Sequence, residues 1–238
     1  MHPKVYKFLT SKKYLNLIKI YHKIFSESFR KDIDISNCYD SELHRLDIIK
    51  YIIKKYNIKS YLEIGCDQNQ VFSNVDVNRK VGVDPVKGGN VRTTSDIFFK
   101  RNKDTFDLIF IDGLHRYHQV KKDIINSLKF LNNNGIILIH DCMPFTFYDQ
   151  ACPRAQSKWN GDVWKAIVEF RTYKDIFTCV GGFDTGIGLI IKKNNLKILD
   201  LNRNGNFKNL KYKDYFKNFK TYLNLVDIND FYKIIDER

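Results

Sequence analysis

The sequence lacks the features of membrane-spanning, exported and zinc-bound proteins. None of its 238 residues lie in a run approaching the ~18 uninterrupted apolar residues of a transmembrane helix. Residues 1–8 contain no apolar segment of the signal-peptide type. The five cysteines are odd in number and include no C-x-x-C pair, which argues against a disulfide framework or a zinc site. We therefore expect a cytoplasmic protein in a reducing compartment.

Acidic residues are also few relative to basic ones. The chain has 27 Asp and Glu against 40 Lys and Arg, a formal net charge of +13. This excess suggests an anionic partner, such as a nucleic acid, a phosphate-bearing substrate or a membrane. The lysines are spread along the chain without a long run, so a soluble enzyme from a lysine-rich proteome fits equally well. The length and the 43% hydrophobic content predict one folded domain.

Three segments can be distinguished along the chain. Residues 1–40 form a basic helical extension, in which an apolar stripe recurs at roughly helical spacing between lysines. The stripe comprises Tyr6, Leu9, Lys13, Leu17, Ile20 and Ile24. It indicates either a helix packed on the domain or a docking helix for a membrane surface or partner. Residues 41–193 form the main domain, and residues 194–238 are a basic, aromatic, helical extension packed on it. We expect the main domain to begin with a helix over Ser41–Tyr56, capped by Ser41.

Short apolar runs and helical segments alternate through the main domain. The runs, rich in Ile, Val and Leu, are Tyr61–Ile64, Val81–Val83, Leu108–Ile111 and Ile136–Ile139. Such runs are typical of parallel strands buried on both faces. A crossover helix is predicted over Tyr117–Leu131, and strand–helix–strand alternation predicts a doubly wound α/β sheet.

The second half of this domain predicts a loop, a helix and a hairpin. The segment Cys142–Lys158 is long and irregular, as lids and substrate loops often are. A helix is expected from Asp162 to Tyr173. The runs Phe177–Val180 and Ile187–Ile191 predict a closing antiparallel hairpin around a turn that contains Asp184-Thr185-Gly186. That turn either edges the site or only closes the hairpin.

A glycine turn followed by an acid forms the first candidate site. Gly65 follows the run Tyr61–Ile64, where its backbone freedom permits a sharp turn close to a ligand. Asp84 ends the next run, near the ~20-residue interval expected between such a turn and a ribose-binding carboxylate. An adenosine cofactor would donate its ribose hydroxyls to this carboxylate.

These residues resemble the first motif of class I S-adenosylmethionine-dependent methyltransferases, E-x-G-x-G-x-G. The chain reads Glu63-Ile64-Gly65-Cys66-Asp67-Gln68-Asn69 and keeps only the first glycine. A nicotinamide site would need the other glycines for its pyrophosphate, so their absence favours S-adenosylmethionine. The resemblance implies a Rossmann-like, mostly parallel seven-stranded sheet that ends in the antiparallel hairpin. By the same resemblance the cofactor-binding residues are Glu63, Gly65, Cys66, Asp67, Asp84, Pro85, Ser95, Asp96 and Asp112.

Two acids and two histidines form the second candidate site. Asp112 and Asp141 each follow a predicted strand; His115 lies three residues past Asp112, and His140 directly precedes Asp141. Ligands in such sheets bind at the carboxyl ends of the strands, so the four side chains are expected to converge. Transfer of a methyl group to a weakly acidic hydroxyl needs a base or a metal. Asp112 and Asp141 are candidate ligands for Mg²⁺ or Mn²⁺, and His115 is the candidate base.

The segments around these residues resemble a more specific group. Phe106–His115 and Leu138–Cys142 are similar to the methyltransferase domain 24-like, macrocin-type sugar O-methyltransferases, which use a D-x-x-H arrangement with magnesium. That group carries paired acids where this chain has His140-Asp141-Cys142, a departure that puts metal binding in doubt. The resemblance implies O-methylation of a sugar hydroxyl in a glycan, glycolipid or glycosylated metabolite.

Two further residues are candidate substrate contacts. Asp162 could hold substrate, and Trp164 could stack on a sugar ring. The competing interpretation makes Asp162 a helix cap and Trp164 a core residue.

Alternative functions and partners remain open. A nucleic-acid methyltransferase would use the basic charge, although no N-P-P-Y-type or cysteine-nucleophile motif is present, so nucleic acid is not the expected partner. A non-catalytic S-adenosylmethionine-binding module is a second alternative. The basic ends are candidates for contact with a membrane or glycolipid, and a homo-oligomer is a further candidate assembly.

Overall fold

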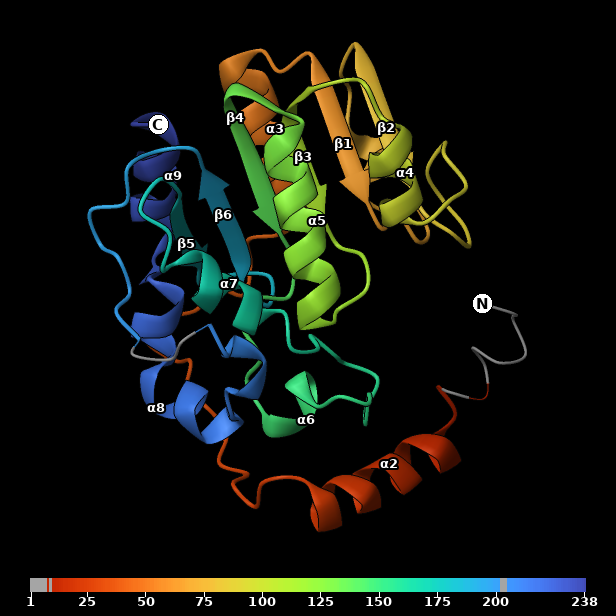
Figure 1. The fold of residues 1–238 in the computed structure, drawn as a ribbon, viewed down its shortest axis with the longest axis vertical. Coiled ribbons are helices and arrows are strands. Elements are labelled where there is room, and N and C mark those ends of the chain that lie inside the picture. Colours follow the sequence, from red (N-terminus) through yellow and green to blue (C-terminus); the bar gives the residue numbers. More distant parts are fainter. Residues whose placement is uncertain (1–7, 9, 202–204) are drawn as a thin grey trace.

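The computed structural model describes residues 8, 10–201 and 205–238, and a seven-stranded sheet forms its centre (Figure 1). The strands are β1 (Ser60–Ile64), β2 (Arg79–Val83), β3 (Phe106–Ile111), β4 (Leu131–Ile139), β5 (Phe177–Gly181), β6 (Ile187–Ile191) and β7 (Leu225–Val226). Their order is β2-β1-β3-β4-β6-β5-β7. Strand β6 runs antiparallel to both of its neighbours, and the other adjacent pairs are parallel. The predicted α/β, Rossmann-like fold class is confirmed.

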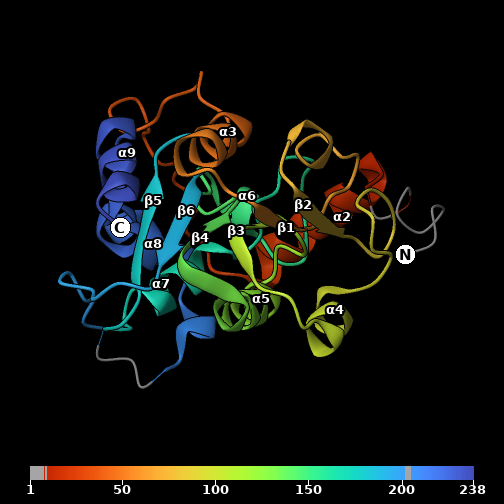
Figure 2. The same ribbon diagram turned by 90° about the horizontal axis from the view of Figure 1, so that it is seen from above.

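Helices cover both faces of this sheet. Figure 2 shows α3 (Arg45–Tyr56) and α9 (Ile228–Asp236) over one face, and α4 (Ser95–Arg101), α5 (Tyr117–Lys129) and α7 (Trp164–Phe170) over the other. Successive side chains of β3 point to opposite faces of the sheet. Ile109 and Ile111 pack on the side of α5 and α7, whereas Leu108 and Phe110 pack on the side of α3 and α9. Because both faces are apolar, polar side chains that follow these strands are directed to the carboxyl edge of the sheet.

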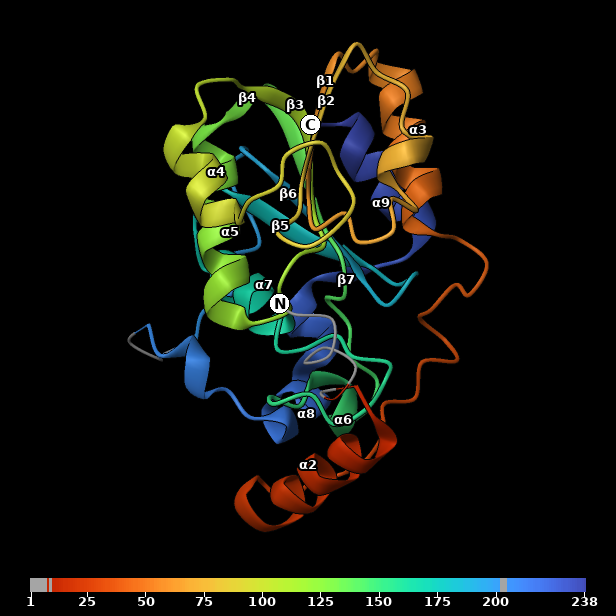
Figure 3. The same cartoon turned by 90° about the vertical axis from the view of Figure 1, so that its right-hand side faces the viewer.

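The two terminal extensions contact the main domain more extensively than their sequences predict. In the N-terminal one, α2 spans Lys12–Phe25 and is followed by a segment without regular structure that inserts Ile33 into the core. The predicted stripe residues Tyr6 and Leu9 lie outside the described residues. In the C-terminal one, η2 (Phe207–Asn209) and α8 (Tyr212–Leu223) precede β7, which adds the seventh strand beside β5. Figure 3 shows α2 beside α6 (Phe147–Gln150) and α8, beyond the carboxyl edge of the sheet.

Three predicted helix boundaries are wrong. Helix α3 begins at Arg45, because Asp47 and not Ser41 supplies the side chain that accepts a backbone N–H at its start. Helix α7 begins at Trp164, two residues after Asp162, and ends at Phe170. Helix α5 ends at Lys129 because β4 already begins at Leu131.

The remaining short elements complete the description. The 3-10 helix η1 spans Phe72–Asn74. All five cysteines are free. Within residues 8, 10–201 and 205–238, no helix is both long and apolar enough to cross a membrane.

Candidate functional site

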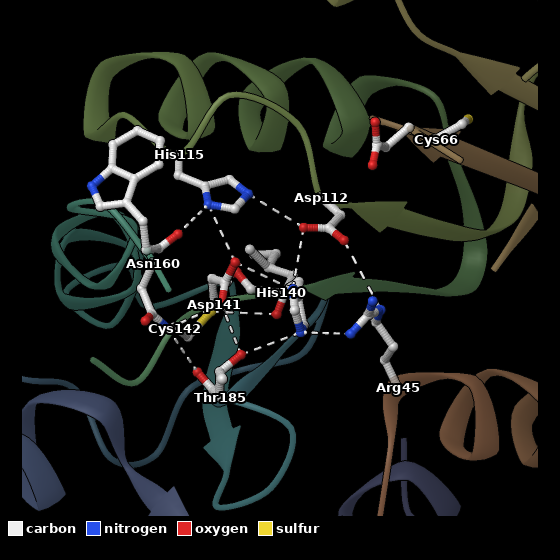
Figure 4. Close-up of polar contacts among 12 residues, drawn as sticks. Arg45, Cys66, Asp112, His115, His140, Asp141, Cys142, Asn160 and Thr185 are labelled. Atoms are coloured by element: carbon white, nitrogen blue, oxygen red, sulfur yellow. Dashed lines mark hydrogen bonds and ion pairs between the residues drawn. The ribbon is translucent and has the colours of Figure 1, made fainter. Parts of the chain in front are cut away.

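A polar cluster lies where β3, β4 and the turn between β5 and β6 meet (Figure 4). Asp112 follows β3 directly, and His140 and Asp141 follow β4. His115 belongs to the connection before α5, and Asp184 belongs to the β5–β6 turn. The structure thus brings together the four side chains that the sequence predicts to converge.

His115 is held by a backbone carbonyl and by two acids. Its Nδ1 lies 3.0 Å from the carbonyl oxygen of Trp159 and 3.2 Å from Asp141 Oδ2, and its Nε2 lies 3.4 Å from Asp112 Oδ1. A carbonyl oxygen only accepts hydrogen bonds, so Nδ1 carries the proton directed at Trp159. In the neutral ring the lone pair is therefore on Nε2, which faces Asp112. The indole ring of Trp159 stacks on the imidazole with 5.5 Å between ring centroids.

Asp141 is oriented by four polar groups. Its φ of 60° is a left-handed conformation, which Asp tolerates better than most residues. Oδ1 accepts hydrogen bonds from Asn160 Nδ2 at 3.0 Å and from Thr185 Oγ1 at 2.7 Å. Oδ2 lies within 3.3 Å of a nitrogen of each of the two histidines. The carboxylate thus has little rotational freedom.

His140 lies among three acids and one arginine. Its Nδ1 is 3.2 Å from Asp112 Oδ1, and its Nε2 is 3.2 Å from Asp184 Oδ1. Arg45, at the start of α3, donates its backbone N–H and Nη1 to Asp184 Oδ2 at 2.7 and 3.1 Å. The Arg45 side chain also approaches Asp112, with 4.0 Å between Nε and Oδ2. Arg45 and Asp184 therefore close the side of the cluster opposite His115, as Figure 4 shows for Arg45.

Opposite charges within this cluster shift its pKa values. Burial by itself lowers the pKa of His140, but the charges of Asp112 and Asp141 outweigh it and hold that pKa well above the usual range. For His115 burial is likewise outweighed, by the hydrogen bond to Asp112 and the charge of Asp141, and its pKa is raised. Burial acts against the charge of Asp112, yet the neighbouring imidazoles keep the pKa of its carboxyl below the ordinary value. The carboxylates and imidazoles stabilise each other's charged forms.

Asp112, His115 and Asp141 form the set of described residues that could hold a metal ion. One ligand atom from each lies within 4.8 Å of the others. Carboxylate oxygens suit Mg²⁺ and Mn²⁺, so the donor set fits such a cation. The Oδ1 atom of Asn160, next to Asp141, is buried without a hydrogen-bond partner and could serve a ligand there. Cys142 is fully buried in the apolar core, so the second acid of a paired-acid motif has no substitute at that position.

The glycine turn after β1 lies directly against Asp112. Gly65 has a φ of 88°, and a Cβ atom at this position would be 2.2 Å from the backbone oxygen of Asp112. Only glycine fits both the conformation and the space. The turn predicted to bind the cofactor and the acid–imidazole cluster are therefore adjacent at the same edge of the sheet.

Asp84 accepts four backbone hydrogen bonds. Its Oδ2 accepts backbone N–H groups from Cys66 at 3.2 Å and Asp67 at 3.1 Å. Its Oδ1 accepts those of Val86 at 2.7 Å and Lys87 at 2.9 Å. A carboxylate has about four acceptor positions, so the ribose hydroxyls would have to replace some of these bonds. Asp84 ties the glycine turn to the end of β2, and its ribose contact stays a prediction.

The other predicted cofactor residues occupy two places. Glu63 and Cys66 are buried beside the glycine turn, where Glu63 accepts a 2.5 Å hydrogen bond from Tyr61. Pro85 follows Asp84 in the adjoining loop. Ser95 and Asp96 begin α4, and their side chains contact Gln119 of α5 at 3.2 and 3.1 Å. Those contacts join α4 to α5, and cofactor binding by Ser95 and Asp96 stays a prediction.

The structure contradicts the stacking role predicted for Trp164. Its side chain is fully buried and packs on Tyr215, with 4.7 Å between ring centroids. The carboxylate of Asp162 accepts the backbone N–H of Tyr117 at 2.8 Å and so caps α5. The structure thus favours the competing interpretation for Trp164, a core tryptophan. Asp162 accepts the first N–H of α5, whereas its own helix α7 begins without a side-chain cap.

Sequence reasoning missed three residues of the cluster. Arg45 was not singled out because it lies in a helix far from the strand ends along the chain. Trp159 and Asn160 directly follow the segment Cys142–Lys158, the long loop predicted to be functional, so that prediction ends one residue before them.

One family model matches part of the chain. The family model described as a methyltransferase domain matches residues 62–142, from within β1 to the residue after Asp141. No curated protein matches the chain.

Several solved structures have a similar fold. An O-methyltransferase from Bacillus cereus in complex with SAH is 12% identical, with 76% of this chain and 99% of that chain covered and a TM-score of 0.45. The SAH-bound methyltransferase PaMTH1 from Podospora anserina is 16% identical, with 77% and 97% covered and a TM-score of 0.48. MycE, from the mycinamycin biosynthetic pathway and bound to Mg, SAH and mycinamycin VI, is 13% identical, with 79% and 57% covered and a TM-score of 0.45. The segment that matches the methyltransferase-domain model, residues 62–142, contains the glycine turn and the four clustered side chains Asp112, His115, His140 and Asp141.

Proposed function

We propose that the protein is an S-adenosylmethionine-dependent O-methyltransferase whose acceptor is a sugar hydroxyl of a glycan, glycolipid or glycosylated metabolite. The observation that carries the proposal is the packing of the Gly65 turn on the backbone of Asp112. It makes the predicted cofactor turn and the acid–imidazole cluster neighbours within a methyltransferase-domain segment. A methyl donor at the turn would therefore meet an acceptor at the cluster.

The chemistry requires alignment and removal of one proton. The acceptor oxygen attacks the methyl carbon, the carbon–sulfur bond breaks, and its electron pair stays on sulfur to give S-adenosylhomocysteine. The hydroxyl proton must leave in the same process. His115 presents Nε2 beside Asp112, and the carbonyl of Trp159 fixes this tautomer. We assign the proton to His115 Nε2, with Asp112 and Asp141 orienting the ring and the acceptor.

A divalent cation is compatible with this assignment. Asp112 and Asp141 would hold Mg²⁺ or Mn²⁺ through their carboxylate oxygens, which would leave His115 Nε2 for the proton. When bound, such a cation would increase the acidity of the acceptor hydroxyl. It would also place positive charge between the two carboxylates.

The sugar acceptor is supported by the character of the cluster and by the sequence resemblance. Carboxylate and amide groups of Asp112, Asp141 and Asn160 offer several hydrogen-bond acceptors and donors close together. A polyhydroxylated ring can use several such groups at once, whereas a simple apolar acceptor would leave them without partners.

Calorimetry and methyl-transfer assays test the function in sequence. Purified protein should bind S-adenosylhomocysteine, and binding of NAD in its place would overturn the assignment. Labelled S-adenosylmethionine should then transfer its methyl group to members of a panel of glycosylated acceptors. Transfer only to aglycones or nucleic acids would reject the sugar. Full activity in EDTA would remove the cation and leave the His115 role intact, whereas loss restored by Mg²⁺ or Mn²⁺ would support it.

A further inference from the structure

Helix α2 exposes a continuous apolar face to solvent. Leu17, Ile20, Tyr21, Ile24 and Phe25 follow the i, i+3, i+4, i+7, i+8 spacing of one helix face. Their exposed fractions range from 45% to 71%. Among the described residues, thirteen large hydrophobic side chains are exposed, and six of them lie between Phe8 and Phe25. This concentration in one helix differs from the scattered exposed apolar residues normal for a protein surface.

The outward orientation of this face is fixed by contacts on the opposite face. His22, the buried residue of α2, lies 2.8 Å from Ser26 Oγ through Nδ1 and 2.7 Å from the Pro153 carbonyl through Nε2. Its ring packs edge-on against Phe147 of α6. Ile18, one turn earlier on the same side, packs against the core. Because His22 and Ile18 face the protein, the apolar face must point away from it.

Positive charge borders the exposed apolar face. Lys12 and Lys23 are exposed and lie eleven residues apart, about three helical turns, which places them on one side of the helix; Lys19, between them, has its Nζ 5.4 Å from the ring centroid of Tyr148. No acidic residue occurs between Lys12 and Phe25. An apolar face bordered by lysines is the pattern of helices that lie in the interface of a lipid bilayer.

We propose that α2 binds the surface of an anionic lipid bilayer, with its axis in the membrane plane. The apolar side chains would enter the boundary between headgroups and acyl chains, and the lysines would meet anionic headgroups. A second copy of the chain is a poorer occupant, because a symmetric helix pair would place its lysines against each other without an acid to offset them. With 14 residues, α2 lies on the membrane and does not cross it.

This attachment would give the protein a defined orientation. Helix α2 lies beyond the carboxyl edge of the sheet, the same edge at which Asp112 and His115 lie (Figures 1 and 3). The bilayer would therefore face the end of the molecule that holds the cluster. The inference does not depend on the chemistry of the cluster.

Flotation of the full chain with vesicles tests the proposal. Vesicles of 30% phosphatidylglycerol in phosphatidylcholine should carry the protein, and pure phosphatidylcholine vesicles should carry much less. Ile20→Ser with Ile24→Ser should weaken binding to the mixed vesicles by at least about tenfold, because two apolar side chains are lost from the interface. Leu196→Ser with Ile198→Ser, which are also exposed, is the matched control and should bind like the wild type.

A second pair of variants tests the charge. Lys12→Gln with Lys23→Gln should weaken binding, and raising the salt concentration should do the same. Lys50→Gln with Lys54→Gln, on exposed positions of α3, is the matched control. Retained binding of S-adenosylhomocysteine and an unchanged circular dichroism spectrum would show that each variant is folded.

Three results would overturn the proposal. The first is no flotation with phosphatidylglycerol vesicles, and the second is an equal loss in the variants and their controls. The third is a concentration-dependent dimer, measured by light scattering, that Ile20→Ser with Ile24→Ser abolishes while vesicle binding is absent. That last result would assign the apolar face to a second copy of the chain.

Discussion

At His115 a backbone carbonyl decides which ring nitrogen is available for chemistry. The Trp159 oxygen, 3.0 Å from Nδ1, accepts a hydrogen bond from the N–H of that nitrogen, which leaves Nε2 directed toward Asp112. Catalytic and metal-bound histidines generally depend on such a partner to fix their tautomer. The position of Trp159 therefore affects the proposed reaction although its side chain carries no acid or base.

Replacing His115 by alanine should lower kcat by about 10²–10⁴, the usual contribution of a positioned base. S-adenosylmethionine affinity should change little, because the imidazole faces Asp112 and not the glycine turn. His118→Ala is the matched control, since His118 lies three residues past His115, in the first turn of α5, and is exposed. Steady-state kinetics and calorimetry measure the two effects. A normal kcat in His115→Ala would reject the base role and make His140 the next candidate.

Replacement by phenylalanine should affect stability at Trp164 and turnover at Trp159. Trp164→Phe should reduce stability by about 1–2 kcal/mol through the cavity it leaves, with kcat and KM unchanged. Trp159→Phe removes the 2.7 Å hydrogen bond from Nε1 to the Ala151 carbonyl and disturbs the ring stacked on His115, so kcat should fall. Thermal unfolding and kinetics give both readouts. An acceptor KM raised by Trp164→Phe alone would restore the stacking role.

At the scale of elements, the turn between β5 and β6 supports the cluster. Asp184, Thr185 and Gly186 all have positive φ values, of 40°, 60° and 89°. A Cβ atom at Gly186 would lie 2.4 Å from that of Met143, which explains the glycine. The tight turn brings the Thr185 hydroxyl to Asp141 and the Asp184 carboxylate to His140. A local hairpin thereby completes a site built mainly on parallel strands.

Removing the Thr185 hydroxyl should loosen Asp141. Thr185→Val loses a 2.7 Å hydrogen bond to a carboxylate, so stability should fall by about 1.5–3 kcal/mol and turnover should fall with it. Thr178→Val is the matched control, because the Thr178 hydroxyl is buried on β5 without a hydrogen-bond partner. That control should be neutral or slightly stabilising. Chemical denaturation and kinetics test the pair, and equal losses in both variants would contradict a specific role for Thr185.

At the scale of the whole molecule, buried acids outside the cluster make stability depend on pH. Burial raises the pKa of Glu63 from 4.5 to about 7, and the hydrogen bond from Tyr61 only partly offsets it. Above pH 4.5 the unfolded chain loses this proton while the native protein keeps it, so the native state binds more protons. The contribution is fully present below pH 4.5 and is lost as the pH rises through about 7.

Glu63→Gln should therefore become more stable relative to the wild type as the pH rises from 5 to 8. The expected relative gain is about 3 kcal/mol, since each unit of pKa shift corresponds to about 1.4 kcal/mol. Asp123→Asn should show the same sign but complete its change near pH 6, because burial raises the pKa of Asp123 to about 6. Urea unfolding across this pH range is the measurement. A wild-type-minus-variant difference independent of pH would contradict the buried, protonated state of Glu63.

The sequence by itself determined the strand runs, the glycine turn and the acids and histidines at the strand ends. These are local patterns: buried parallel strands are apolar throughout, and side chains just past their carboxyl ends meet at one edge. Only the tertiary structure brought Arg45, Asn160 and Asp184 to that edge, because they come from distant segments joined by packing.

Packing also decided the structural role of the residues in each sequence pattern. Helical periodicity predicts an apolar stripe in α2 but not whether that stripe faces the protein or the solvent, and here His22 turns it outward. The interval between Gly65 and Asp84 predicts an acid beside the turn, yet backbone N–H groups occupy its oxygens. Of the two nearby tryptophans, Trp164 is buried in the core, whereas Trp159 stacks on His115. The chemical type of each side chain can be read from the sequence, whereas the groups that it contacts are decided by the tertiary structure.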